Sequence, residues 1–283
     1  MIKSPYSNDT KSKPTKIHLP GIELATPSLI SLIGAGGKTT TLFSLAHHFK
    51  QQGLSVLITT TTQMCLPEPI QYDQFIINTD PNLLFTQLTS LPSSPHITYC
   101  CSSHDPQSEK VKGVEMTLLD QVKLSGIFDV ILVEADGAKR LPLKAPAGHE
   151  PCIPNSSDWV IAITGVEMIN VPAQPEKIHR WPLFSQITGI QAGDALDADV
   201  FIRFINHPEG MFKHTPERAG RSWILNKVSQ NDNSLTAFAQ HVLSHAPKLN
   251  TLWLAAMQQD PAIKACWINT PAHLDNDLGS HRF

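Results

Sequence analysis

Residues 29–41 read Leu29-Ile-Ser-Leu-Ile-Gly34-Ala-Gly-Gly-Lys38-Thr-Thr-Thr41. A short apolar run leads into a glycine-rich turn, and a lysine and three threonines then open an amphipathic segment. Glycines permit a tight turn with inward N–H groups, a lysine can neutralise terminal phosphates, and a threonine hydroxyl can bind Mg²⁺. The order of strand, glycine turn and helix therefore predicts a phosphate-binding loop, strengthened by the positive end of the helix dipole.

We expect this loop to bind a nucleotide, ATP or GTP, together with Mg²⁺. The predicted nucleotide-binding residues of the loop are Gly34, Ala35, Gly36, Gly37, Lys38, Thr39 and Thr40. Lys38 is also a predicted catalytic residue, because it would neutralise phosphate charge. The full motif places one more glycine five residues before Gly37, where this chain has Leu32.

Two other interpretations compete with the phosphate loop. The first is a plain glycine turn followed by a surface lysine. The second is a dinucleotide-binding fingerprint, which begins with the same Gly-x-Gly. That fingerprint fails here because Thr39 stands where its third glycine belongs, and because residues 54–62 contain no acidic residue to hold a ribose.

Composition narrows the class of protein. The chain has 283 residues and a net charge of −3, which gives no footprint for nucleic acid. No apolar run is long enough to span a membrane and no signal-peptide core is visible, so we expect a cytoplasmic protein with no membrane partner. The five cysteines lack a C-x-x-C spacing, which suits reduced thiols. The adjacent pair Cys100-Cys101 is either buried as small apolar residues or handles metal or sulfur.

The alternation of apolar runs and amphipathic segments predicts an α/β fold with a mainly parallel sheet flanked by helices. Residues 1–16 read as a flexible tail, and residues 17–283 as a single α/β domain with a less regular inserted segment at about 165–220. Predicted strands cover residues 27–33, 55–60, 74–78, 97–101, 128–133, 159–164, 222–225 and 265–268. Predicted helices cover residues 39–52, 81–88, 115–125, 195–204 and 235–243.

A second constellation follows the strand at residues 128–133. Glu134 and Asp136 would lie at the edge of the sheet where ligands bind, and with Thr39 they form the predicted metal site. Asp136 is also the predicted catalytic residue that positions a water molecule. The same edge would receive the hydroxyls of Thr59–Thr62, unless these threonines only reflect β-branched strand preference.

Three cations follow the acidic pair, and a third constellation lies much later in the chain. Lys139, Arg140 and Lys144 could hold phosphates or an anionic substrate, or could form a solvated basic loop. Asn226 and Lys227 follow a strand as in guanine-binding proteins, so they are predicted nucleotide contacts; the alternative is an ordinary loop. Those proteins carry an aspartate two residues after the lysine, and here Ser229 cannot reproduce its charged contact, which weakens any guanine preference.

Together these segments resemble the YqeC-type family of selenium-dependent hydroxylase accessory proteins. The likeness runs from about residue 28 to about residue 230. Its main segments are Ile33–Thr40, Leu57–Met64, Val133–Lys139, Leu143–Pro146 and Glu150–Pro154. Weaker agreement continues at Thr164–Val166, His179-Arg180, His207–Gly210 and Leu225–Lys227. The resemblance implies a P-loop NTPase-like fold. It also implies a role in maturing a selenium-dependent molybdenum hydroxylase similar to xanthine dehydrogenase, so that enzyme or its cofactor is an expected partner.

Three functions remain open from the sequence. The favoured one is a nucleotide-dependent accessory protein, with nucleoside triphosphatase activity as an open question. The second is an ATP-dependent ligase or kinase that acts on a small anionic substrate, since Mur-type ligases carry a similar loop. The third is a non-catalytic chaperone that binds a molybdopterin dinucleotide through the same loop.

Overall fold

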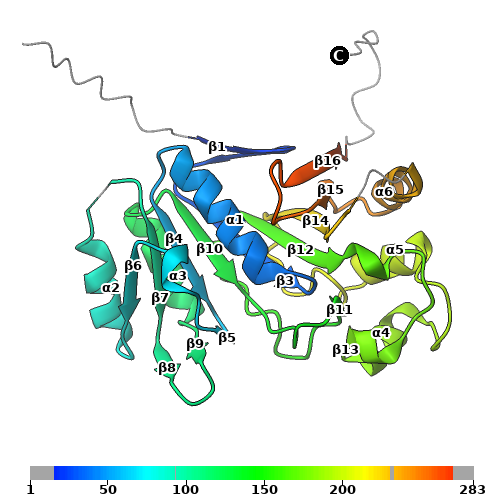
Figure 1. Ribbon diagram of the computed structural model, residues 1–283, viewed down its shortest axis with the longest axis horizontal. Coiled ribbons are helices and arrows are strands. Elements are labelled where there is room, and N and C mark those ends of the chain that lie inside the picture. Colours follow the sequence, from blue (N-terminus) through cyan, green and yellow to red (C-terminus); the bar gives the residue numbers. More distant parts are fainter. Residues whose placement is uncertain (1–15, 93, 230–232, 270–283) are drawn as a thin grey trace, which may run out of the picture.

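The computed structural model describes residues 16–92, 94–229 and 233–269. Its centre is a nine-stranded sheet in which eight neighbouring strands run parallel and the edge strand β16 runs antiparallel (Figure 1). The α/β class and the mainly parallel sheet predicted from the sequence are confirmed. In spatial order the strands are β16 (Ile263–Ile268), β15 (Thr251–Ala255), β14 (Gly220–Asn226), β12 (Trp159–Gly165), β3 (Ser28–Gly34), β10 (Val130–Glu134), β4 (Val56–Thr60), β7 (Ile97–Cys101) and β6 (Gln74–Ile77).

Helices cover both faces of the sheet, because alternate residues of its strands point to opposite sides. On β10, Val130 and Leu132 pack with the face covered by α1 (Lys38–Gln51). Ile131 and Val133 pack with α2 (Pro81–Thr89) and α3 (Met116–Ser125) on the other face. The central strands are therefore apolar throughout, as strands buried on both sides must be.

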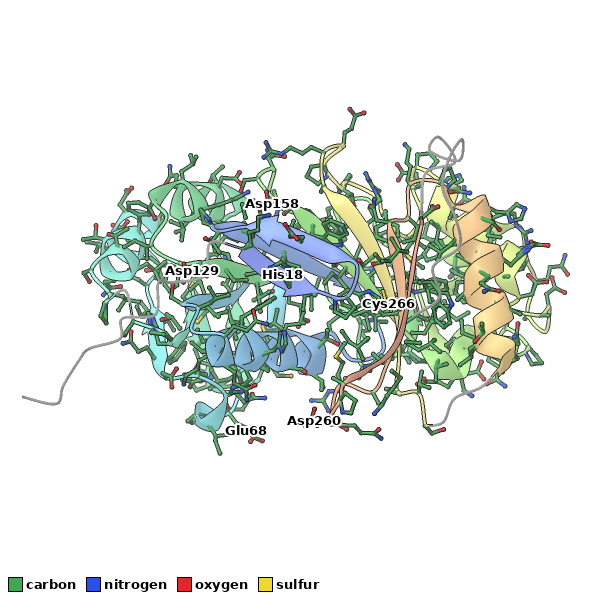
Figure 2. The ribbon with its side chains drawn as sticks, turned by 90° about the horizontal axis from the view of Figure 1, so that it is seen from above. His18, Glu68, Asp129, Asp158, Asp260 and Cys266 are labelled. Carbon is green, nitrogen blue, oxygen red and sulfur yellow. The ribbon has the colours of Figure 1, made fainter. Side chains whose placement is uncertain are left out.

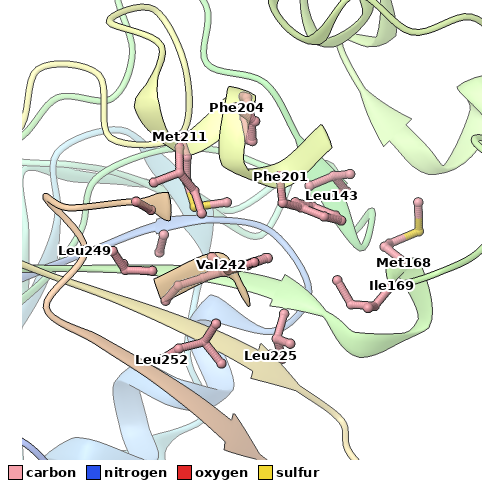
Figure 3. Close-up of a cluster of buried hydrophobic side chains, with 14 of the residues drawn as sticks. Leu143, Met168, Ile169, Phe201, Phe204, Met211, Leu225, Val242, Leu249 and Leu252 are labelled. Carbon is pink, nitrogen blue, oxygen red and sulfur yellow. The ribbon is translucent and has the colours of Figure 1, made fainter. Parts of the chain in front are cut away.

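A third apolar cluster lies under the second half of the chain. It joins β12, β14 and β15 to α4 (Trp181–Thr188), α5 (Ala198–Asn206) and α6 (Asn233–His245). Phe201, Leu225, Val242 and Leu252 meet in its centre (Figure 3). Leu143 of the short strand β11 (Leu143–Lys144) joins the same cluster, which fixes the basic segment after β10 to the core.

The amino-terminal edge of the sheet is held by carboxylates that have no part in the predicted site. Asp129 accepts hydrogen bonds from the Ser55 amide and hydroxyl, each at 2.7 Å. Asp158 accepts one from the Leu29 amide at 2.8 Å and pairs with Lys123 at 2.6 Å. Both aspartates are labelled in Figure 2, beside the hairpin of β1 (Lys16–Leu19) and β2 (Ile22–Ala25). The edge where ligands usually bind in such sheets is the other one, at the carboxyl ends of the strands.

Several short elements were not expected from the sequence. They are the β1–β2 hairpin, the small sheet of β5 (Gln63–Cys65), β9 (Lys110–Lys112) and β8 (Ser103–Asp105), strand β15 and helix α4. The tail expected at residues 1–16 lies outside the described residues except for Lys16, which opens β1. The segment at 165–220 holds the 3₁₀ turns η2 (Val166–Met168) and η3 (Pro175–Lys177), the strand β13 (Ile178–His179), α4 and α5. Throughout the described ranges, every helix is too short or too polar to cross a membrane.

Candidate functional site

The glycine-rich loop connects β3 to α1 at the carboxyl end of the sheet (Figure 1). Gly34, Gly36 and Gly37 have φ angles of 92°, 80° and 120°, a region that side chains rarely adopt. A Cβ on Gly36 would lie 2.2 Å from the Gly165 nitrogen, and one on Gly37 would lie 2.4 Å from Asn226 Nδ2. The loop therefore requires glycine both for its backbone angles and for the close approach of neighbouring strands.

Protein acceptors take up the first N–H groups of the loop and leave the later ones. The amides of Gly34, Ala35 and Gly36 donate to Asp136 Oδ2, the Ile163 carbonyl and the Leu141 carbonyl at 2.8–3.1 Å. Within the described chain the next four amides have no partner, those of Gly37, Lys38, Thr39 and Thr40. Unpaired donors at a helix N-terminus suit an anion, and these four belong to the residues predicted to bind the nucleotide.

Lys38 is the first residue of α1 and is only 5% exposed. Its Nζ donates to the Gly34 carbonyl at 2.8 Å and lies 3.1 Å from Asp136 Oδ1 and 3.9 Å from Glu134 Oε1. Burial alone would lower the pKa of Lys38, but the carboxylates of Asp136 and Glu134 outweigh it and raise the pKa above its ordinary value. The ammonium is therefore charged, and Lys38 is buried rather than the surface lysine that the plain glycine turn would have.

Thr39 and Glu134 form a pair that fits a magnesium ion. Thr39 Oγ1 donates to Glu134 Oε2 at 2.9 Å. Two adjacent oxygen ligands of an octahedral Mg²⁺ at 2.0–2.1 Å would lie about 2.9 Å apart, so both oxygens could stay in place around the ion. Burial raises the pKa of Glu134 despite the opposing charge of Lys38, so a cation would offset the cost of its ionised form.

Asp136 lies below the loop and belongs to a buried chain of alternating charges. Its carboxylate accepts from Gly34 and meets Lys38 at 3.1 Å and Lys144 at 3.0 Å. Lys144 in turn meets Glu150 at 2.7 Å, and Glu150 meets Arg180 at 2.7 Å. The predicted metal and water-positioning role of Asp136 stays a prediction, and it would require the carboxylate to exchange a protein partner. The same holds for the phosphate contact predicted for Lys144, which is 3% exposed.

Asn226 ends β14 and clamps the loop from the other side. Its Nδ2 donates to the Gly36 carbonyl at 3.0 Å, and its Oδ1 accepts from the Met257 amide at 3.3 Å. Lys227 follows with a φ of 70° and an ion pair to Glu167 at 2.8 Å. Base contacts by this pair stay a prediction, whereas the structural work of Asn226 is evident from its two hydrogen bonds.

The loop, Glu134 and Lys227 line a cleft of about 1010 Å³ at the carboxyl end of the sheet, whereas Asp136, Lys144 and Asn226 are not among its lining residues. One wall is the loop with Lys38, Thr39 and Thr40, and Glu134 lies at its floor. The remaining charged lining is mostly basic: Lys110, Lys112, Lys139, Arg140, Arg180 and Lys227, with Glu150 as the other carboxylate. A basic cleft around a helix N-terminus suits a polyanion.

Comparison with known proteins gives the chain its relatives. The profile of the family described as "YqeC protein" matches residues 30–182, which is more than half of the chain. A protein of Escherichia coli (strain K12), described as "Uncharacterized protein YqeC", is 37% identical over 246 residues, covering 86% of this chain and 93% of its own length.

The chain belongs to the YqeC family. The part matched by the YqeC profile contains the loop, Glu134, Asp136, the basic segment and Arg180. Asn226 and Lys227 lie beyond that part. The resemblance drawn from the sequence motifs is thereby confirmed at the level of the family.

Two further expectations concern residues around the YqeC cleft. Of the four threonines at 59–62, Thr59 and Thr60 are buried and donate to the Cys100 and Glu134 carbonyls, each at 2.8 Å. Thr61 and Thr62 line the cleft. Cys100 and Cys101 are both fully buried, and burial raises the pKa of their thiols to about 12 and about 11. They match the interpretation of the pair as small apolar core residues.

The sequence did not single out Glu150, His179 or Arg180 as site residues. His179 and Arg180 appeared only as weak agreement with the YqeC family. Both line the cleft. His179 ends β13, which pairs with β11 in a two-stranded sheet, and Arg180 caps α4 directly after it. The signal that could have found them is the proximity of β13 to the basic segment, which is a tertiary contact and leaves no local pattern.

Proposed function

We propose that this chain binds a nucleoside triphosphate with Mg²⁺ in the cleft and acts as a nucleotide-dependent accessory protein. The observation that carries the proposal is the group of four amides at residues 37–40 that have no partner among the described residues, beside the charged Lys38 and the Thr39–Glu134 pair. Anion donors, a positive charge and one oxygen ligand for a hard cation thus lie in the first turn of α1, and the second oxygen ligand comes from the end of β10.

Each part of this site has a distinct role in the proposal. The amides of residues 37–40 and the Lys38 ammonium would bind the phosphate oxygens. The Thr39 hydroxyl and the Glu134 carboxylate would hold Mg²⁺, which neutralises phosphate charge when bound. The Gly34 carbonyl and Asp136 keep Lys38 extended along the loop before any ligand arrives.

The physiological setting of the proposal comes from the family resemblance. We propose that the nucleotide-dependent step assists maturation of a selenium-dependent molybdenum hydroxylase of the xanthine dehydrogenase type. The size and charge of the cleft also suit a nucleotide-bearing cofactor. Mass spectrometry of small molecules that co-purify with the native protein would identify which of these is bound.

The experiment that tests the nucleotide site is a calorimetric titration with ATP and GTP, each with Mg²⁺. We expect Lys38→Ala to weaken binding at least about ten-fold, the loss of one charged contact. Lys248→Ala is the matched control, because Lys248 is exposed and lies outside the cleft. Equal affinities in the wild type and Lys38→Ala, with both folded by circular dichroism, would overturn the proposal.

A second candidate is an ATP-dependent ligase or kinase acting on a small anionic substrate. The observation in its favour is the volume of the cleft, about 1010 Å³, which lies at the upper end of the range for one small ligand. Transfer of phosphate or adenylate to an added small acid would support this candidate. Hydrolysis that requires a protein partner would support the accessory role.

A further inference from the structure

The cleft has a second basic wall that the phosphate loop does not use. It is formed by Lys139, Arg140, His179 and Arg180. Lys139 and Arg140 come from the segment after β10, and the other two come from the end of β13 and the start of α4. Lys139 and Arg180 both act electrostatically on His179, so two segments separated by about forty residues bring their cations close together. Arg140 Nη2 donates to Cys65 Sγ at 3.6 Å.

The backbone of this wall adopts angles that non-glycine residues avoid. Lys139, Arg140 and Arg180 have φ angles of 47°, 60° and 62°. Seven non-glycine residues in the described ranges have positive φ, and four of them line the cleft, the fourth being Lys227. Such strain persists where the surrounding structure fixes it, and it concentrates at ligand sites.

Several hydrogen-bond donors of this wall have no partner among the described residues. Arg180 bonds to the Ala145 carbonyl and to Glu150 through Nη1 alone, at 3.3 and 2.7 Å. Its Nε and Nη2 have no partner in the part of the chain described, and the same is true of the Lys139 ammonium and the His179 ring. Glu150 therefore holds one nitrogen of a guanidinium whose other donors are free for a planar oxyanion.

The pKa of His179 reflects the positive charge of the residues around it. Burial, followed by Arg180, Lys144 and Lys139, lowers the pKa of His179 to about 4, against a smaller opposing effect of Glu150. The ring is therefore neutral at pH 7, surrounded by three cations and one carboxylate. A bound anion would relieve the repulsion between those cations and the protonated ring.

We propose that Lys139, His179 and Arg180 form a binding subsite for an oxyanion, phosphate or carboxylate, of a second small-molecule substrate. This subsite is distinct from the glycine loop proposed to bind the nucleotide phosphates. The inference rests on the proposed function only in taking the molecule bound at that loop to be a nucleotide. The guanidinium of Arg180 can donate two parallel hydrogen bonds to two oxygens of the anion, and the exposed Lys139 adds a positive charge. The buried chain from Arg180 through Glu150, Lys144 and Asp136 reaches Lys38, so the two sites share one set of ion pairs.

The test is a titration of the full chain with inorganic phosphate or acetate, followed by NMR of the histidine rings. Lys38→Ala is included as a control, because this variant should bind phosphate weakly at the glycine loop. A response that persists in it then comes from the subsite. We expect the pKa of His179 to rise by about one unit or more in phosphate, acetate or both, in the wild type and in Lys38→Ala. The anion that acts identifies the oxyanion class of the substrate.

Two variants test the named contacts: one lies outside the buried chain, and the other keeps a positive charge at the chain's outer end. Lys139→Ala removes an exposed cation, and Arg180→Lys keeps a positive charge for Glu150 but removes the paired donors of the guanidinium. We expect each to weaken anion binding about three- to ten-fold, while Lys248→Ala leaves it unchanged. If neither anion moves the His179 signal, or if both variants bind as the wild type does, the subsite is refuted. If the wild type binds no nucleotide but its His179 signal responds to the anion, only the proposed function is refuted.

Discussion

Glu134 and Asp136 are two residues apart in sequence, yet the structure gives them different surroundings. Glu134 Oε2 accepts a hydrogen bond from the Thr39 hydroxyl, and Glu134 Oε1 lies 3.9 Å from Lys38 Nζ. Asp136 is held by two lysines and a backbone amide. A metal ion would replace few contacts at Glu134 and several at Asp136. Substitutions of the two carboxylates should therefore have different effects on metal-dependent binding and on stability.

We expect Glu134→Gln to weaken Mg²⁺-dependent nucleotide binding about ten-fold or more while leaving metal-free binding unchanged, because it removes one anionic ligand. Asp136→Asn should instead lower the melting temperature, because it leaves two buried lysines with less compensation. Calorimetry with and without Mg²⁺, combined with thermal melting, distinguishes the two. Identical metal dependence in the wild type and Glu134→Gln would make the Thr39–Glu134 pair purely structural.

Ser229→Asp addresses the choice of base. An aspartate two residues after Lys227 would offer guanine a charged acceptor that the serine hydroxyl cannot match. We therefore expect the ratio of GTP to ATP affinity to increase about ten-fold or more. An unchanged ratio in competition titrations would mean that the Asn226-Lys227 segment does not contact the base.

At the scale of elements, the loop depends on two neighbouring strands, β12 and β14. Gly36→Ala would place a Cβ 2.2 Å from the Gly165 nitrogen, a clash with backbone that cannot move aside cheaply. We expect this variant to lose nucleotide binding, by about ten-fold or more, and to melt at a lower temperature. Gly137→Ala is the control on the same cleft, since its Cβ would meet nothing within 4 Å. Equal binding by the two variants would contradict the fit of the loop against β12.

The same scale explains what could be predicted from the sequence. Long apolar strands such as β3 and β12 and helix α1 carry clear periodicity, so their positions could be read directly. β15 is five residues long, and α4 contains a proline at its second position, so neither shows a decisive pattern. The loop is formed by consecutive residues, so its place between strand and helix could also be read from the sequence, and its binding role stays a prediction. The burial of Lys144 and the clamp by Asn226 depend on partners far away in sequence, and no local signal reports them.

At the scale of the whole molecule, Glu150 joins the loop region to the segment of α4. Burial would raise its pKa, but hydrogen bonds from Lys144 and Arg180 lower it to about 2, from an ordinary value of 4.5. The stabilisation is thus present above pH 4.5 and is lost as the pH falls toward 2.

Glu150→Gln should therefore lower the free energy of unfolding by about 3 kcal/mol near neutral pH, the usual range for breaking a buried pair. The difference from the wild type should shrink as the pH falls from 4.5 toward 2, measured by thermal or urea unfolding. Glu176→Gln is the control, because Glu176 is exposed and no described residue pairs with it. A difference that is constant across this pH range would mean that the Glu150 charge does not stabilise the fold.

Hydrogen bonds to the Ile163 and Leu141 carbonyls, to Asp136 and from Asn226 fix the glycine loop. A ligand that enters therefore finds its receptor already shaped and has little chain entropy to remove. Association should be fast and limited by diffusion and charge, and the free and ligand-bound forms should give nearly the same hydrogen-exchange rates for the loop amides that bond to the protein.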